Sequence, residues 1–367
     1  MTEANSEIIP KQNNDILKHA WKLFAVYDKN AIIQQSLYKK FQFAILLLGI
    51  IVTILSLASA TISPQQFTQT NNNNNGTSSS GQTTQINNNT TESTSELFLR
   101  YVIIILPISI SILVASSTYF KYGNKWVMLR NAAEEIKSEI YQYRTRVGNY
   151  KENKDSPNDQ QKPLKPEEKL SQQVEIINNQ LMSSEVGLSS LSKYDGKLPP
   201  KMYGAAENDD GFSVLDPDKY VSIRIDDQIN YYQGKTGRMY KNLQILQWSI
   251  FIAGGIGTFI AALGLELWVA LTSTIVSVFT IYLQYNQIEN TLIKYNQALT
   301  QLNNIKAWWS ILSEEQKKDP LNIDKLINAT ELTLVTEHQT WIKNIKDAVS
   351  KIHTIEKSEK GKQGNSQ

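Results

Sequence analysis

The sequence predicts an all-α, multi-pass membrane protein, and three observations support this prediction. Four segments carry no charged residue, namely residues 43–61, 101–120, 248–265 and 267–283. Outside them, apolar residues recur at helical spacing, and lysines and arginines gather on one side of the four segments. Each segment is about 17–20 residues long, enough for a helix to span the roughly 30 Å hydrocarbon core of a bilayer. Because backbone amides find no partner in lipid, these segments must be helices.

The composition excludes several classes of function. The net charge is only +2, so bulk charge gives no case for a nucleic-acid partner. The chain has no cysteine, which excludes disulfides, thiol catalysis and thiolate metal sites. Its three histidines, His19, His338 and His353, show no metal-ligand spacing, and no phosphate loop or nucleophile–base pair is visible. We therefore expect no enzyme activity and no cofactor.

The first half of the chain is expected to form one unit. Residues 1–12 are expected to be disordered, and residues 13–150 to run as helix, two membrane helices and helix. The loop at residues 63–96 is rich in Asn, Ser and Thr, so it cannot bury enough apolar surface to order itself. Pro107 lies in the second membrane segment. It removes one backbone hydrogen bond and predicts a kink there.

The second half is expected to repeat the first. Residues 151–217 form a linker with one helix at residues 166–184, residues 218–352 form a second unit, and residues 353–367 form a disordered tail. Both halves end their second membrane helix with the pattern Tyr-x-x-Tyr, at residues 119–122 and 282–285. Their predicted topology is the same, as in a parallel repeat.

In each half the second membrane helix is expected to continue beyond the membrane as a long helix. Its apolar residues alternate between spacings of three and four, which is typical of a coiled-coil seam. The seams are Trp126, Leu129, Ala133, Ile136, Ile140 and Tyr143 in the first half, and Tyr285, Ile288, Leu292, Tyr295, Leu299 and Leu302 in the second. Apolar faces at residues 170–181 and 334–352 are the expected packing partners, so the polar part of the chain should be a helical bundle.

The third membrane segment carries a stripe of small residues. Ala253, Gly257, Ala261 and Gly264 recur at i, i+4, i+8 and i+11, which lets another helix approach closely. The favoured interpretation is helix packing within the chain. Packing between chains is the alternative.

The fourth membrane segment carries a polar stripe. Glu266, Ser273, Ser277, Thr280 and Gln284 share one helical face. One interpretation is a pore lining with an acidic outer mouth. The favoured alternative is hydrogen bonding between helices or to the helix's own backbone.

Basic residues near the membrane segments predict the orientation. Lysines precede the first segment, and basic residues follow the second and precede the third. Ser63–Leu99 has none. Both termini and the central linker are therefore expected to be cytoplasmic.

Three stretches of the sequence resemble a known family. After the second membrane segment, Arg130, Ala133, Glu134, Lys137, Glu139 and Tyr141 form one pattern. Arg224, Tyr231 and Tyr232 precede the third segment, and Glu331, Glu337 and Trp341 lie near the end. Together they resemble the bacterial SLATT family, a two-transmembrane domain otherwise catalogued as a domain of unknown function, here in a duplicated form.

The resemblance implies a pore-forming or membrane-perturbing effector of prokaryotic conflict systems, triggered by a nucleotide-generating or nucleotide-sensing partner. We therefore expect an oligomeric effector or channel in the bacterial cell membrane, with the lipid bilayer and a second copy of the chain as partners. No sensor domain is recognisable, so the trigger would be a separate cytoplasmic protein or nucleotide-signalling molecule. The alternative is a membrane scaffold whose cytoplasmic coiled-coil bundle recruits a partner protein.

Overall fold

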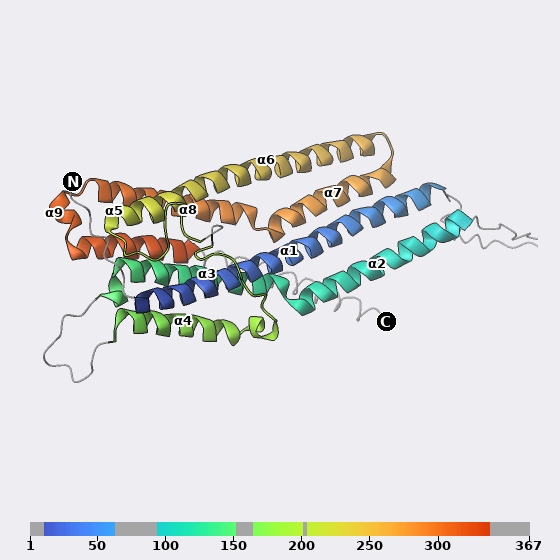
Figure 1. Cartoon of the computed structure of the whole chain (residues 1–367). Coiled ribbons are helices and arrows are strands. Elements are labelled where there is room, and N and C mark those ends of the chain that lie inside the picture. Colours follow the sequence, from blue (N-terminus) through green and yellow to red (C-terminus); the bar gives the residue numbers. More distant parts are fainter. Residues whose placement is uncertain (1–10, 63–93, 152–163, 201–203, 338–367) are drawn as a thin grey trace, which may run out of the picture. The chain divides into compact units, whose positions relative to one another are not determined.

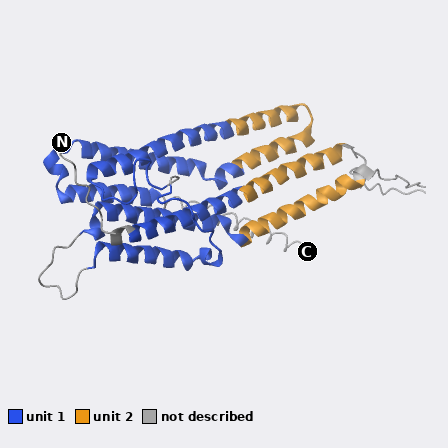
Figure 2. Cartoon of the chain, viewed as in Figure 1, with its two compact units in different colours: residues 1–39, 120–247, 281–367 blue, residues 40–119, 248–280 orange. Residues whose placement is uncertain are grey.

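The computed structural model describes residues 11–62, 94–151, 164–200 and 204–337, and these residues form helices and no strand. The expected disorder at both ends of the chain, most of the loop at 63–96, and Trp341 lie outside them. The described chain divides into two compact units (Figure 2). Unit 1 comprises residues 1–39, 120–247 and 281–367, and unit 2 comprises residues 40–119 and 248–280.

Twelve labelled elements follow one another along the described residues (Figure 1). The long helices are α1 (Lys11–Ile62), α2 (Thr94–Phe120), α3 (Tyr122–Thr145), α4 (Pro166–Met182), α6 (Asp226–Ala262), α7 (Glu266–Tyr285) and α8 (Ile288–Ser310). Short turns of helix are η2 (Gly148–Tyr150), η3 (Glu185–Leu188), α5 (Pro217–Tyr220), η4 (Val221–Ile225) and α9 (Glu314–Lys317). A further helix begins at residue 320 and is described as far as residue 337. The all-α fold is confirmed.

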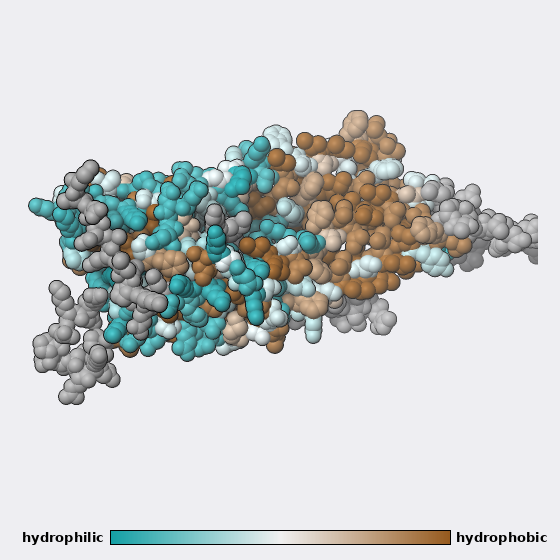
Figure 3. Space-filling view, viewed as in Figure 1, coloured by the Kyte–Doolittle hydropathy of each residue, from teal (hydrophilic) through white to brown (hydrophobic). Residues whose placement is uncertain are grey.

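Unit 2 contains the membrane candidates. Four helices are long and apolar enough to cross a membrane, and their most apolar windows are almost unburied within the chain. Large side chains such as Phe43, Ile108, Phe251 and Phe259 are exposed there. Figure 3 shows apolar residues gathered over these helices. Side chains of this kind are stable on a protein surface when lipid, and not water, surrounds them.

Unit 1 has a core of its own. Trp21, Phe24 and Tyr27 of α1 are fully buried and belong to the same apolar cluster as Leu129 and Ile136 of α3. The predicted apolar faces of α3 and α4 are confirmed as buried, and these two helices pack against each other. The predicted face of α8 is buried at Ile288 and Leu302 and half-buried between them. The polar part of the chain is therefore a helical bundle.

The expectation of one continuous helix running on from each second membrane segment is wrong. Lys121 separates α2 from α3 and has a φ of 52°, and Gln287 precedes α8 with a φ of 47°. A left-handed residue cannot continue an α-helix. The apolar pattern runs on across both points, so the side chains gave no sign of the break. The two halves share this feature.

Candidate functional site

The polar stripe of the fourth membrane segment lies on α7. Glu266, Ser273, Ser277 and Gln284 are exposed in the single chain, and Thr280 is half-buried. The Thr280 hydroxyl donates to the Val276 carbonyl of its own helix at 2.8 Å. The hydroxyl of Thr280 is thus bonded to the backbone of its own helix, which was the favoured alternative, whereas the two serines lie on the outer surface of the chain.

The small-residue stripe lies on α6, and its members differ. Gly257 is buried, and a Cβ there would lie 2.6 Å from the Thr272 hydroxyl oxygen on α7. Ala253 is half-buried and Ala261 is exposed. The expectation that Gly264 extends the helical stripe is wrong, because α6 ends at Ala262 and Gly264 sits in the following turn with a φ of 76°. Gly257 is thus a point of close approach between α6 and α7.

Pro107 lies inside α2, and the helix continues beyond it to Phe120. The kink predicted there stays a prediction. Two serines of α2 bond to the backbone of their own helix. The Ser109 hydroxyl donates to the Ile105 carbonyl and the Ser111 hydroxyl to the Pro107 carbonyl, each at 3.0 Å. The carbonyl of Pro107 itself is therefore satisfied by a side chain.

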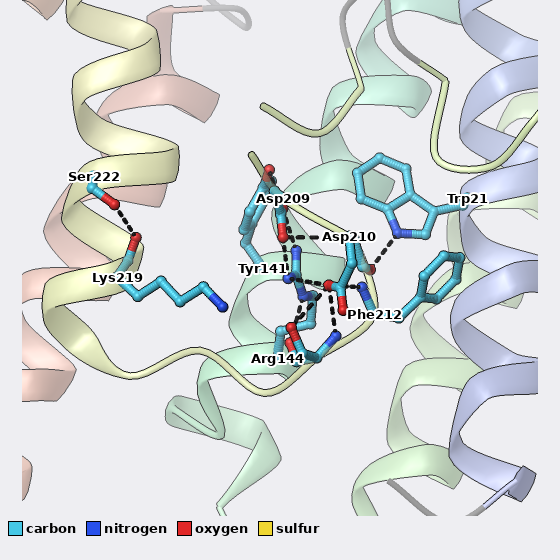
Figure 4. Close-up of polar contacts among 10 residues, drawn as sticks. Trp21, Tyr141, Arg144, Asp209, Asp210, Phe212, Lys219 and Ser222 are labelled. Atoms are coloured by element: carbon cyan, nitrogen blue, oxygen red, sulfur yellow. Dashed lines mark hydrogen bonds and ion pairs between the residues drawn. The ribbon is translucent and has the colours of Figure 1, made fainter. Parts of the chain in front are cut away.

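Unit 1 contains a buried ion pair that sequence reasoning missed. The fully buried Arg144 of α3 donates to Asp209 through two nitrogens, at 2.7 and 2.5 Å, and its Nε donates to the Ser213 carbonyl at 2.9 Å (Figure 4). Paired forks of this kind are the strongest ion-pair geometry. The sequence predicts a loop at residues 187–217. The ion pair anchors the part of this loop around Asp209 to α3.

The backbone around Asp209 is also held in place. Asp210 accepts from the amides of Phe212 and Ser213 at 2.9 and 3.0 Å, and the Trp21 indole donates to the Gly211 carbonyl at 2.7 Å. Gly211 has a φ of 77°, and a Cβ there would lie 2.6 Å from the Pro199 ring, so only glycine fits. Figure 4 shows Asp209 and Asp210 facing Arg144, with Trp21 beside this segment.

A second buried ion pair lies in the other half of the chain. Arg224 donates to Glu331 at 2.9 and 2.8 Å, and the Tyr220 hydroxyl donates to the same carboxylate at 2.8 Å. Burial alone would lower the pKa of Arg224, but the adjacent Glu331 carboxylate outweighs burial and raises it. Arg224 lies in η4, a π-helical turn, and such turns often mark functional positions.

Tyr141 joins the two ion pairs. The Arg224 guanidinium lies 4.5 Å from its ring centroid and the Arg144 guanidinium 5.5 Å from it. Cations at this distance are attracted to the face of an aromatic ring. Burial raises the pKa of Tyr141, so the phenol stays protonated. Three residues that carried the family resemblance, Tyr141, Arg224 and Glu331, thus lie together in unit 1, and the arrangement braces helices of both halves. It offers neither a nucleophile–base pair nor, among the described residues, a group of side chains that could hold a metal ion.

The fold and this bundle define an all-α multi-pass membrane protein with a polar helical unit. Residues 220–341 match the family model of the SMODS and SLOG-associating 2TM effector domain 1, and residues 22–158 match that of a protein of unknown function (DUF4231). The resemblance to the SLATT family is thus confirmed for residues 220–341. The first half matches a different model, so the duplicated form is supported only in part. No curated protein and no solved structure matches the chain.

Proposed function

We propose that the chain is a non-enzymatic membrane effector whose copies assemble and permeabilise the bilayer through unit 2, under the control of unit 1. The observation that carries the proposal is the coincidence of a 2TM effector domain with four membrane-length helices in one chain. The bilayer and a second copy of the chain are its partners. In this proposal the two matched regions are repeats of one unit. Both have a residue in the left-handed conformation directly after their second membrane helix.

The exposed serines of α7 support an assembly of several chains. Ser273 and Ser277 lie on the outer surface of a single chain, in an otherwise apolar helix. A hydroxyl gains nothing from lipid, whereas at an interface between chains it can bond another helix or line a polar path. Four helices of one chain pack into a filled bundle, so a water-filled path needs several subunits or a rearrangement.

The proposal also includes orientation and trigger. The family resemblance favours a bacterial cell membrane, and the basic residues around the membrane segments favour an orientation with both termini and the central linker cytoplasmic. A description as SMODS- and SLOG-associating supports a separate trigger, either a cytoplasmic protein or a nucleotide-signalling partner, that acts on the cytoplasmic bundle.

Release of a trapped dye from lipid vesicles tests the proposal. The full chain is expected to release the dye, and Ser277→Leu on α7 is expected to reduce the release by about tenfold because an apolar side chain closes a polar path. Ser111→Leu is the matched control, since Ser111 is exposed on α2 and its hydroxyl bonds its own backbone. It should release dye as the wild type does.

Intact vesicles around a folded, oligomeric protein, with or without candidate nucleotides, would contradict the proposal. Recovery of one stoichiometric protein partner by the same preparation would then favour the membrane scaffold.

A further inference from the structure

Unit 1 contains a cavity, open to solvent, that neither ion pair lines. Its volume is about 410 Å³, and its walls come from α3, residues 204–207, α6, α8 and the end of the helix at residues 320–337. Binding sites for small molecules typically measure about 300–1,000 Å³. The cavity is therefore large enough for a small organic molecule.

The charges on its described walls favour a cation. Four carboxylates, Glu134, Glu207, Asp227 and Glu337, face two basic groups, Arg130 and Lys137. Both basic groups already have acidic neighbours. Arg130 donates to Glu134 at 2.6 Å and is also bonded to Asp28, and Lys137 is held near Glu134 and Asp227. A cation entering the cavity would meet an excess of negative charge.

Tyrosine rings form another part of the wall. Tyr232 and Tyr295 have ring centroids 5.2 Å apart, and Tyr231 lies 5.4 Å from Tyr232. The Tyr232 hydroxyl donates to Glu337 at 3.1 Å, and both side chains are almost fully buried. A fixed carboxylate beside aromatic rings is a combination that recognises ammonium groups. The carboxylate attracts the positive charge, and the ring faces attract a weakly hydrated cation.

We propose that this cavity binds a small organic ammonium ion, whose charge lies between Glu337 and the rings of Tyr231 and Tyr295. The site goes beyond the proposed function, since binding is expected whether or not the chain permeabilises membranes. An ammonium with apolar substituents binds better than K⁺, because the ring faces and the apolar Ala205 and Ala206 of the wall favour its alkyl groups.

Isothermal titration of the detergent-solubilised full chain with choline and tetraethylammonium tests the site. At least one of them is expected to bind saturably in the micromolar to millimolar range. Glu337→Gln keeps the shape and the acceptor for Tyr232 but removes the charge, and it should weaken binding by about tenfold. Tyr295→Leu should weaken binding by about threefold or more.

Two matched variants serve as controls. Glu315→Gln removes an exposed carboxylate and Tyr240→Leu an exposed tyrosine ring, and neither residue lines the cavity. Both should bind as the wild type does. Circular dichroism verifies that each variant is folded. Should Glu337→Gln fail to fold, Asp227→Asn, at an exposed position on the same wall, replaces it and should weaken binding by about threefold.

Three results would overturn the site. The first is no saturable binding of either ammonium ion at millimolar concentration. The second is equal affinity in the wild type and the charge-removed variant. The third is tighter binding of inorganic pyrophosphate, which would show that Arg130 and Lys137 dominate the cavity.

Discussion

At the scale of single residues, the buried ion pairs are the most sensitive features of unit 1. Removing two charges from water is costly, and the cost is offset only when every polar group is bonded. Glu331 meets this condition through Arg224 and Tyr220, and Asp209 through Arg144 and the Gly211 amide. Loss of one partner leaves the other charge buried without compensation.

Glu331→Gln is expected to lower the free energy of unfolding of unit 1 by about 3–5 kcal/mol, since it leaves the Arg224 charge unmatched. Thermal or denaturant unfolding in detergent measures the change. Lys18→Gln is the control: Lys18 pairs with Asp15 at 3.6 Å on the exposed surface, and its loss should cost less than about 1 kcal/mol. Equal effects of the two substitutions would show that the buried pair does not brace the unit.

Lys137 gives unit 1 a specific pH dependence. Burial lowers its pKa from 10.5 to about 8, and the neighbouring Glu134 offsets only part of that effect. Between pH 8 and 10.5 the folded chain binds fewer protons at this residue than the unfolded chain, so stability rises with pH in that window. Below pH 8 the full cost of the buried charge is present.

The wild type is therefore expected to gain about 1 kcal/mol of stability per pH unit from this residue between pH 8 and 9.5, because the folded lysine is still half protonated at pH 8. In Lys137→Met this gain should vanish, and the variant should be the more stable protein at pH 7. Unfolding measured below pH 10 avoids the buried tyrosines, such as Tyr27, whose pKa burial raises to about 12. Identical pH profiles for the two proteins would mean that the Lys137 amine is solvated.

The sequence pointed to part of this network only. Arg130, Glu134, Lys137 and Tyr141 were recognisable because they form part of the pattern that resembles the SLATT family. Arg224 and Glu331 were recognisable as well, but their pairing across 107 residues was not, and neither was the pairing of Arg144 with Asp209 across 65 residues. No local spacing links residues that only the tertiary fold brings together, and a loop aspartate gives no signal of burial.

At the scale of helices, the spacing of apolar residues predicted well which segments are helical and which of their faces are buried. It predicted poorly where the helices end. The membrane segments and the buried faces of α3 and α4 follow from residue type and spacing. The breaks at Lys121 and Gln287 do not, because a left-handed backbone at a polar residue leaves the apolar pattern intact. The end of α6 at Ala262 was missed for a related reason: Gly264 fits both a packing stripe and a helix-terminating turn.

Gly257 provides a test of the packing between α6 and α7. Gly257→Ala places a methyl group 2.6 Å from the Thr272 hydroxyl oxygen and should destabilise the chain by about 1–3 kcal/mol. Gly254→Ala is the matched control, since its added Cβ would meet no atom within 4 Å. It should leave stability unchanged or raise it by up to about 1 kcal/mol, since alanine is the better helix former.

The double variant Gly257→Ala with Thr272→Ala should recover most of the loss, because the clashing oxygen is gone. Heat-induced unfolding in detergent measures all four proteins. A Gly257→Ala protein as stable as its Gly254→Ala counterpart would contradict the close approach of the two helices.

At the scale of the whole molecule, each unit has a surface suited to a different solvent. Unit 1 buries most of its aromatic side chains and keeps most charges outside, as a water-soluble bundle does. Unit 2 leaves large apolar side chains exposed along all four of its helices. The sequence predicted this division directly, because runs of uncharged residues report the solvent without any knowledge of tertiary contacts.

The absence of cysteine makes the proposed orientation easy to measure. Two single-cysteine variants are needed: Thr70→Cys, between α1 and α2, and Lys318→Cys, next to α9. We expect them to react differently with a maleimide that cannot cross membranes. On intact cells only the first should be labelled, and after lysis both. Labelling of Lys318→Cys on intact cells would contradict the proposed orientation.

The central claim is that lipid surrounds unit 2 and not unit 1, and tryptophan quenching by lipids with brominated acyl chains tests it most directly. Trp248 and Trp268 of unit 2 are exposed, whereas Trp21 and Trp309 of unit 1 are buried. The full chain in such vesicles should lose part of its fluorescence, and Trp248→Phe combined with Trp268→Phe should abolish most of that quenching. Quenching that is absent from the wild type, or unchanged in the double variant, would contradict the account.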